Sequence, residues 1–469
     1  MNQIPKILSA IFLITFLSCK KFVEVPPPNT RLVGSTVYSS NTTAAAAVTG
    51  IYQSMTSTLI GGGGQGISAI LGLSADEFTL FPNLDTKINQ VYTNSLNSGN
   101  LVPIWEPLYN YIYQSNLAIE LLTNNKSVTS PLKEQLLGEA KFIRAFCYLY
   151  LNHFFGDVPL VKTTDYVNNS SISRTPTSDV YQQIVADLND AILLLPADYV
   201  NGNGEPVLER VRPNKFAAKA ILSRALLYQE NWSAAESEAT DIINDNKFIL
   251  QTDLTKVFTS NNSEAIFQLQ SPNNGFNAPD GAFLDGLLFY GGPQPYAPFL
   301  LNDSLVNSFD ASDLRRQHWI TQNQVGTKTY YYPYKYKLSY TGSPPTEYPV
   351  LIRLAEIYLI RSECRLNQGN IPGALEDLNT IRSRAGLTKI TTSNAENLKI
   401  SILKERQHEL FTEYGHRWID LKRSKKLDEV MKKATQLKGG IWNASDNLFP
   451  IPKTEILTNN RLVQNPGYN

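Results

Sequence analysis

Apolar residues recur along most of this chain every three or four positions, the spacing that places them on one face of an α-helix. The clearest example is the segment 176–195, whose pattern stops at Pro196. Ser130 and Pro131 form a favourable N-cap and first-turn pair, which opens a helical pattern that ends at Gly156. The pattern therefore predicts a series of helices, over residues 131–155, 176–195, 213–229 and 232–244.

Two helical stretches resemble each other and indicate an internal repeat. The sequence AILSRALLYQENWSAAESEATDII (220–243) is echoed by LIRSECRLNQGNIPGALEDLNTIR (359–382). Superposing Ala235 on Ala374 also brings Ser223 onto Ser362. A helix, a short turn and a second helix that begins with a buried alanine is the layout of a tetratricopeptide repeat. Weaker pairs are predicted for 42–60 with 104–123, and for 131–155 with 178–195.

The helical pattern breaks in the centre of the chain. Residues 261–349 are rich in Gly, Pro, Asn and Tyr, which predicts irregular structure with some short strands. The run GGGGQG (61–66) fits G-x-G-x-x-G, but it follows a helical pattern rather than a strand, so we interpret it as a flexible surface loop and not a phosphate site. The predicted fold is mostly α, a tetratricopeptide-like helical-repeat array with irregular, partly β insertions. Its regions are 42–260 (N-terminal array), 261–349 (aromatic-rich insertion) and 350–469 (C-terminal helical region).

The first residues are typical of a secreted protein. The apolar run 7–17 suits a signal peptide and is shorter than the ~20 residues that span a membrane. It ends at Ser18-Cys19, which resembles the lipobox of bacterial lipoproteins. We therefore expect residues 1–18 to be a signal peptide, Cys19 to be a lipid anchor, and 19–41 to be an extended tether that contains a PPP run. The alternative is an ordinary signal peptide that leaves Cys19 as a free thiol.

Composition narrows the function classes. Lys plus Arg and Asp plus Glu both number 42, so the chain lacks the basic surplus of a nucleic-acid binder. Hydrophobic residues at 42% predict a packed core rather than a disordered chain. Cys147 and Cys364 lie in amphipathic helical patterns, so we expect two buried thiols rather than a disulfide.

Six blocks of sequence resemble the SusD/RagB family and occur in the family's order. They are AKFIRAFCYLYLNHFFGDVPLV (140–161), PVLIRLAEIYLIRSECRLNQG (349–369), LNTIRSRAGL (378–387), ERQHELFTEYGHRWIDLKR (405–423), LFPIPKTEI (448–456) and QNPGY (464–468).

The resemblance implies a SusD-like helical array with ligand-facing insertions, lipid-anchored in the outer membrane and facing outside. It also implies a non-catalytic protein that binds a nutrient, most often an oligosaccharide or polysaccharide. Such proteins deliver the ligand to a SusC-like TonB-dependent transporter. We therefore expect that the protein has no catalytic residue, no cofactor and no metal, and that it does not bind nucleic acid.

Enzyme motifs are incomplete in this sequence. HELFT (408–412) begins like the zincin motif H-E-x-x-H, but Thr412 stands where the second His is required. Asp76 with Glu77, or Glu405 with Glu409, could be proposed as glycosidase carboxylates, which must lie ~5–10 Å apart across a cleft. We interpret one charged group as a lattice that holds the C-terminal helix: Glu405, Arg406, Glu409 and Arg417. The alternatives to a binding protein are a protein-binding helical scaffold and, less favoured, a glycoside hydrolase.

Aromatic residues in the irregular segments are the candidate ligand contacts. A sugar ring packs its C–H face on an aromatic face, while its hydroxyls need polar partners, and loops at the surface commonly carry function. Trp319 is our preferred residue, because it is the single Trp of residues 261–349 and follows Arg315, Arg316 and Gln317. For each candidate the alternative is local packing. The candidates are Phe78, Phe81, Asn83, Tyr290, Tyr296 and Trp319.

The lipid anchor leads to a direct test. Each buried acyl methylene contributes about 0.8 kcal/mol, and several acyl chains on one cysteine make attachment effectively permanent. We therefore expect Cys19→Ala to move the protein from the membrane fraction to the soluble fraction, as followed by fractionation and immunoblotting. Unchanged membrane partitioning of the variant would contradict the assignment.

Overall fold

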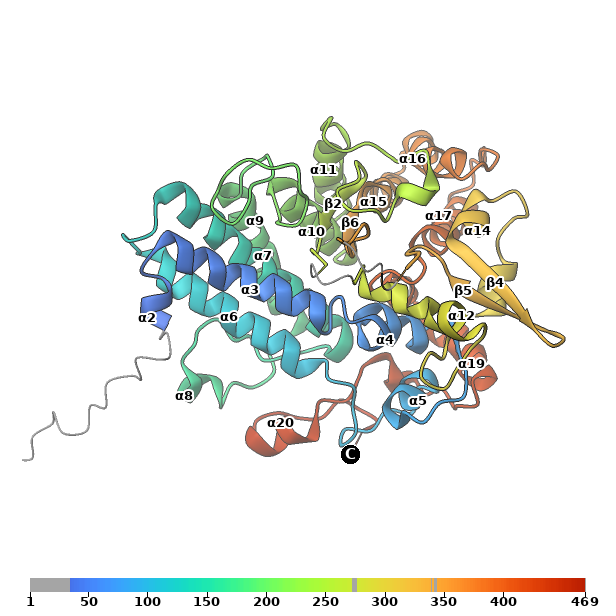
Figure 1. Cartoon of the computed structure of the whole chain (residues 1–469), viewed down its shortest axis with the longest axis horizontal. Helices are drawn as coiled ribbons and strands as arrows, with labels where there is room; N and C mark the ends of the chain where they lie inside the picture. The colour runs from blue at the N-terminus through green and yellow to red at the C-terminus, as the bar shows by residue number, and fades with distance from the viewer. Residues whose placement is uncertain (1–33, 272–275, 339, 341–343, 469) are drawn as a thin grey trace, which may run out of the picture.

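The computed structural model describes residues 34–271, 276–338, 340 and 344–468. Cys19, the signal peptide and most of the tether lie outside the described residues. Antiparallel helices lie side by side from α3 and α6 at one end of the molecule to α17 at the other (Figure 1). The N-terminal helices are α2 (Gly34–Val37), α3 (Asn41–Ser57), α4 (Ile67–Ser74), α5 (Thr86–Tyr92), α6 (Trp105–Thr123), α7 (Ser130–Phe155), α8 (Tyr166–Asn169), α9 (Thr177–Leu194), α10 (Lys215–Tyr228) and α11 (Trp232–Ile243).

The C-terminal region completes the array. No helix in the described part of the chain is long and apolar enough to cross a bilayer. Cys147 in α7 and Cys364 in α15 are buried free thiols, as predicted. The C-terminal helices are α15 (Leu354–Asn367), α16 (Ile371–Arg384), α17 (Ala395–Leu410), α18 (His416–Arg423), α19 (Leu427–Leu437), η5 (Ala444–Asn447) and α20 (Lys453–Thr458).

The predicted repeat between α10/α11 and α15/α16 is confirmed at the level of single hydrogen bonds. The Ser223 hydroxyl donates to the carbonyl of Ala235 at 2.9 Å, and the Ser362 hydroxyl donates to the carbonyl of Ala374 at 2.7 Å. All four residues are buried, so each serine ties the two helices of its pair at their closest approach. The pairs also contact each other, because the Arg365 guanidinium of α15 pairs with Glu236 of α11 at 3.0 Å.

Helix α7 is the central helix of the N-terminal half of the array. Nearly all of its residues from Gln135 onward are buried, and α6 and α9 pack against it. A bidentate ion pair joins Arg144 of α7 to Asp187 of α9 at 2.6 and 2.8 Å, and the same guanidinium donates to Asn116 of α6. One arginine therefore fixes three neighbouring helices.

The central insertion consists of short elements and antiparallel two-stranded sheets, as the sequence predicts. Strand β1 pairs with β3 in the register Phe78↔Leu301, β2 pairs with β6, and β4 pairs with β5. The β4–β5 hairpin projects at the right of Figure 1. The short elements of the insertion are β2 (Ala265–Gln268), η4 (Pro279–Leu284), α12 (Asp285–Tyr290), β3 (Phe299–Leu301), α13 (Asp303–Asn307), α14 (Leu314–Trp319), β4 (Ile320–Val325) and β5 (Lys328–Pro333). The short elements outside it are η2 (Gly63–Gln65), β1 (Phe78–Leu80), η3 (Leu254–Lys256) and β6 (Val350–Arg353).

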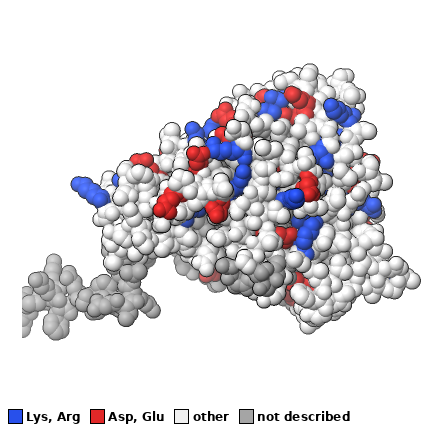
Figure 2. Space-filling view, turned by 45° about the horizontal axis from the view of Figure 1, so that its top comes forward, with Lys and Arg blue, Asp and Glu red and all other residues white. Residues whose placement is uncertain are grey.

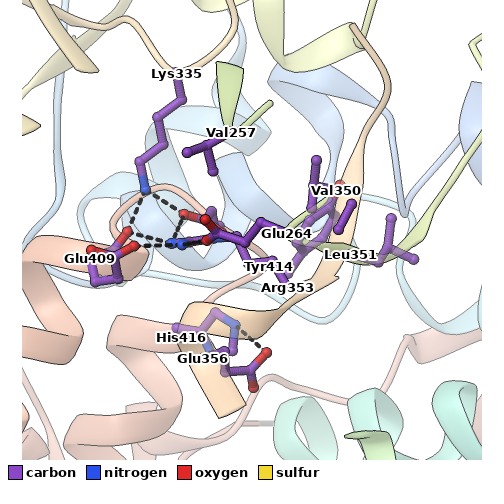
Figure 3. Close-up of polar contacts among 12 residues, drawn as sticks. Val257, Glu264, Lys335, Val350, Leu351, Arg353, Glu356, Glu409, Tyr414 and His416 are labelled. Atoms are coloured by element: carbon purple, nitrogen blue, oxygen red, sulfur yellow. Dashed lines mark hydrogen bonds and ion pairs between the residues drawn. The ribbon is translucent and has the colours of Figure 1, made fainter. Parts of the chain in front are cut away.

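A buried ion lattice connects the insertion to the C-terminal helices. Arg353, at the end of β6, binds Glu264 at 3.0 Å, Glu409 at 2.5 Å and Glu413 at 2.7 Å. Lys335, which follows β5, also converges on Glu409 by donating to its backbone carbonyl at 2.9 Å (Figure 3). The members of this lattice are Glu264, Asp313, Arg315, Lys335, Arg353, Arg384, Glu405, Glu409 and Glu413.

The predicted charged lattice is thus confirmed for Glu405 and Glu409 and is larger than the sequence indicates. Arg406 and Arg417 belong to neighbouring pairs, with Asp420 at 2.7 Å and with Asp76 at 2.7 Å. Burial alone would raise the pKa of Glu409, but Arg384, Arg353 and Arg315 hold it well below its usual range. Glu409 is therefore charged at neutral pH.

A second buried pair ties two repeats together. Arg224 of α10 forms a bidentate pair with Glu356 of α15, both contacts at 2.6 Å, and His416 lies 3.8 Å from the same carboxylate (Figure 3). Burial would raise the pKa of Glu356, but Arg224 and His416 lower it from 4.5 to about 2. A carboxylate with a depressed pKa stabilises the fold above its unfolded-state pKa and loses that contribution as the pH falls through the folded value.

We expect Glu356→Gln to lower the free energy of unfolding at pH 7 by about 3–5 kcal/mol, because it leaves the Arg224 cation buried without a counter-charge. The difference from wild type should shrink as the pH falls from 4.5 towards 2, where Glu356 itself becomes protonated. Urea unfolding at several pH values measures this. The matched control is Glu429→Gln, whose carboxylate pairs with Lys426 on the surface at 2.8 Å and should change stability by less than about 1 kcal/mol. Equal effects of the two substitutions would contradict the assignment.

Candidate ligand-binding site

A pocket of about 550 Å³ opens where the end of α3 meets the central insertion. We call it the aromatic pocket. Helix α3, a glycine run, η4 and α12 form its walls, so it joins segments that lie far apart in the sequence. Its described lining residues are Thr56, Ser57, Gly62, Gly63, Gly64, Phe276, Asn277, Pro279, Ala282, Asp285, Phe289 and Tyr340.

The glycine run 61–66 is not the flexible surface loop that the sequence suggested. Gly63 is buried with a φ of +54°, and a Cβ there would lie 2.7 Å from the Pro279 carbonyl oxygen. A Cβ on Gly64 would meet the ring of Phe299 at the same distance. Glycine is therefore required because the run packs tightly against the insertion, and it forms one wall of the pocket.

Exposed aromatic rings line the pocket and continue beyond it. The rings of Phe276 and Tyr340 pack against each other with centroids 5.1 Å apart, and Phe289 is 60% exposed. Next to Phe289 lie Tyr290 and Tyr296, which form an edge-to-face pair at 5.0 Å. Both tyrosines are ligand contacts predicted from the sequence, and the structure places them beside the pocket. Phe276 and Phe289 were not predicted from the sequence, although both lie in the irregular aromatic-rich segment.

One polar side chain at the pocket wall retains hydrogen-bonding capacity. The Asn277 carbonyl oxygen accepts from the backbone N–H groups of Thr346 at 2.9 Å and Glu347 at 3.1 Å, which fixes the side chain. Its Nδ2 amino group is buried and finds no acceptor in the described part of the protein. Buried donors are normally satisfied, so an unpaired donor beside aromatic faces suits a ligand that carries acceptor oxygens.

The candidates in and near β1 make contacts within the protein. Phe78 is fully buried and packs on Phe283 and Phe299, with ring centroids 5.2 and 5.9 Å apart, so our expectation that it contacts a ligand is wrong. Phe81 is partly buried and packs against a small cluster formed by Leu284, Leu300 and Tyr332. Asn83 forms a turn, in which its side-chain Oδ1 accepts from the backbone N–H of Asp85 and its Nδ2 donates to the Asn89 side chain. The phenylalanines thus support the pocket from below.

Our prediction that Trp319 contacts the ligand is also wrong. Its side chain is 0% exposed, and its indole N–H donates to the Leu254 carbonyl at 2.8 Å. The Nζ of Lys335 lies 4.9 Å from the ring centroid, within the range of a cation–π contact. Arg315, which we expected to meet sugar hydroxyls, belongs to the buried ion lattice instead. Trp319 is therefore a core anchor beneath that lattice.

Few charges surround the aromatic pocket. Residues 286–302 contain no charged side chain, and Figure 2 shows a largely uncharged surface towards the right of that view, where the insertion projects in Figure 1. Among the described lining residues, Asp285 is the single carboxylate. Across all the residues that the structure describes, no group of three or more His, Cys, Asp or Glu side chains could hold a metal ion.

The residues of the incomplete enzyme motifs make contacts within the protein. Asp76 pairs with Arg417, and Glu77 is buried, where it accepts from the Thr412 N–H at 3.1 Å. Burial raises the pKa of Glu77 to about 8. His408 stacks on Phe309 with ring centroids 4.1 Å apart, and burial lowers its pKa to about 3. None of these groups lines the aromatic pocket.

Two family models match separate parts of the chain. One is described as the SusD family and matches residues 312–468, and the other, described as starch-binding associating with outer membrane, matches residues 75–227. SusD-like protein P25 of Formosa agariphila is 25% identical over 539 aligned residues, which cover 100% of this chain and 99% of that protein. Starch-binding protein SusD of Bacteroides thetaiotaomicron is 34% identical over 136 residues, which cover 28% of this chain and 23% of that protein.

Solved structures share the fold over nearly the whole chain. A laminarin binding SusD-like protein superposes with a TM-score of 0.76 and 22% identity, covering 92% of this chain and 100% of that one. A SusD superfamily protein from Parabacteroides distasonis superposes with a TM-score of 0.78 and 22% identity, covering 93% and 100%.

The reassignment of Trp319 gives a prediction about stability. We expect Trp319→Ala to lower the free energy of unfolding by about 3–5 kcal/mol, because it removes a fully buried indole and leaves a cavity. Tyr296→Ala, which truncates a ring that is 67% exposed, should leave stability within about 1 kcal/mol of wild type. Thermal and urea unfolding of both variants measure this. A Trp319 variant as stable as wild type would show that the indole is not a core anchor.

Proposed function

This chain belongs to the SusD/RagB family, and we propose that it binds a neutral oligosaccharide or polysaccharide in the aromatic pocket without cleaving it. The observation that carries the proposal is the set of exposed aromatic rings beside the Asn277 Nδ2 group, which has no acceptor among the described residues. Phe276, Phe289 and Tyr340 offer faces to the C–H side of sugar rings, and the amide offers a donor to a sugar oxygen. The tyrosine pair extends this surface outside the pocket.

A neutral ligand follows from the charges near the site. An anionic glycan would require lysine or arginine side chains at the surface, but none lines the aromatic pocket among the described residues. Arg315 of the insertion and Arg353 at the end of β6 are held in the buried ion lattice. The relatives named for starch and for laminarin bind polymers of this neutral kind, which supports the same ligand class here.

Binding without catalysis is supported by the state of the carboxylates. Hydrolysis of a glycosidic bond requires two carboxyl groups on opposite sides of the substrate. Asp285 has no second carboxylate facing it among the described lining residues, and the carboxylates of the lattice are paired with buried cations. The proposed role is therefore capture of the glycan.

The site of action that we propose is the outside of the outer membrane, with Cys19 lipidated and the glycan passed to a SusC-like TonB-dependent transporter. Membership of the family, one of whose models is described as associating with the outer membrane, supports this step. Mild-detergent purification through a C-terminal tag tests it. Recovery of a large β-barrel partner is expected, and repeated recovery of the protein alone would count against it.

Binding should depend on the exposed rings. We expect Phe289→Ala and Tyr290→Ala each to weaken glycan binding by about 1–2 kcal/mol, because each removes an aromatic face from the ligand surface. Affinity electrophoresis in gels that contain starch or laminarin gives the first comparison, and isothermal titration gives the dissociation constants.

The matched control is Tyr166→Ala, which truncates a tyrosine of α8 that is exposed far from α12 (Figure 1). Its affinity should equal that of wild type, and circular dichroism should show all three variants folded. If neither polymer retards the wild-type protein, or if the Phe289 and Tyr290 variants bind as wild type does, the proposed function or its site is wrong.

A further inference from the structure

A second pocket lies on the other side of the end of α3. We call it the polar pocket. It has a volume of about 730 Å³, larger than the aromatic pocket, and its walls come from α3, from the segment 200–212 and from the residues that follow β2. Its described lining residues are Thr49, Tyr52, Gln53, Thr56, Val200, Asn201, Gly202, Val207, Glu209, Val211, Arg212, Gln270 and Ser271.

The floor of the polar pocket is held in place by buried interactions. Arg212 forms a bidentate pair with Glu139 of α7 at 2.7 and 3.0 Å and donates to the Thr49 hydroxyl at 2.7 Å. Gln135 donates to both Glu139 and the Asn201 carbonyl, which fixes the segment 200–212 against α7. Because the charges of Arg212 and Glu139 cancel, the floor offers a rigid surface without strong selection for an ion.

The rim of the polar pocket carries available hydrogen-bonding groups. Gln53, Glu209 and Gln270 make no side-chain hydrogen bond or ion pair with the described part of the protein, and all three are exposed. The amides of Gln53 and Gln270 can each donate and accept. Val200, Val207 and Val211 add apolar surface between them. This mixture suits a ring with hydroxyls at its edge better than it suits a lipid or a phosphate.

The two pockets meet at one residue. Thr56, in the last turn of α3, lines both of them, and Gln53 lies one turn earlier on the same helix. Thr56 is itself buried, so the two pockets adjoin along the end of α3, one on each side of this residue. The two pockets differ in chemistry, with aromatic faces in one and amides in the other.

From this adjacency we infer that the two pockets form a single groove and that the ligand is an extended saccharide chain long enough to occupy both. One part of the chain packs on Phe276, Phe289 and Tyr340, and the next part hydrogen-bonds to Gln53 and Gln270. The inference rests on the proposed function and adds a requirement for chain length. Short fragments fill the aromatic pocket alone, so they lack the second set of contacts.

The test uses defined fragments of starch and of laminarin, from the disaccharide upward, titrated into the full mature protein. Affinity should rise with fragment length and then level off once both pockets are filled. The double variant Gln53→Ala/Gln270→Ala should weaken binding of the longest fragments roughly tenfold, since each lost hydrogen bond contributes about 0.5–1.5 kcal/mol, and should leave binding of the shortest bound fragment unchanged. Phe289→Ala should weaken both long and short fragments.

A matched control is Gln182→Ala, since Gln182 is an exposed glutamine of α9 that lines neither pocket, and it should bind every fragment as wild type does. Affinity that is independent of length, or a double variant equal to wild type on the longest fragments, would overturn the single groove while leaving the aromatic site intact. Absence of all binding by wild type is a different result, because it removes the proposed function and the groove with it.

Discussion

The buried ion lattice around Arg353 and Glu409 holds the central insertion, which consists of short helices and two-stranded sheets, against the C-terminal helices. Its members come from separate parts of the chain: Glu264 before β2, Arg315 and Lys335 near the β4–β5 hairpin, Arg353 at the end of β6, Arg384 at the end of α16, and Glu409 with Glu413 at the end of α17. Each buried charge costs several kcal/mol to desolvate, so each is tolerable where it is paired. The pairing therefore specifies a single position for the insertion against the helices.

The position of the insertion determines the ligand surface. With Lys335 paired in the lattice and Trp319 seated beneath it, η4 lies against the glycine run at the end of α3, with no space for a side chain at Gly63. The rings of Phe78, Phe283 and Phe299 fill the space below. The aromatic pocket is the gap that remains between α3 and the insertion. A change in the lattice would therefore alter a surface that it does not touch.

The exposed rings are arranged before any ligand arrives. Phe276 packs on Tyr340, and Tyr290 packs edge-to-face on Tyr296, so each pair restricts the rotamers of its members. Rings that are already ordered lose less conformational entropy on binding, which favours affinity on a shallow surface. Helices whose hydrogen bonds are internal provide the rigid support, and the loops between them provide the chemistry.

The sequence by itself determined the helices, the repeat and the family. Helical periodicity is a local property, so the segments 131–155, 176–195, 213–229 and 232–244 could be predicted without the tertiary structure, and the equivalence of Ser223 with Ser362 followed from aligning two helix pairs. Which aromatic residues face solvent was decided by the tertiary structure alone. In an irregular segment no period relates sequence position to the buried side, so Trp319 and Tyr290 look alike in sequence. The contacts of Lys335 and Leu254 bury the first, and the turn after α12 exposes the second.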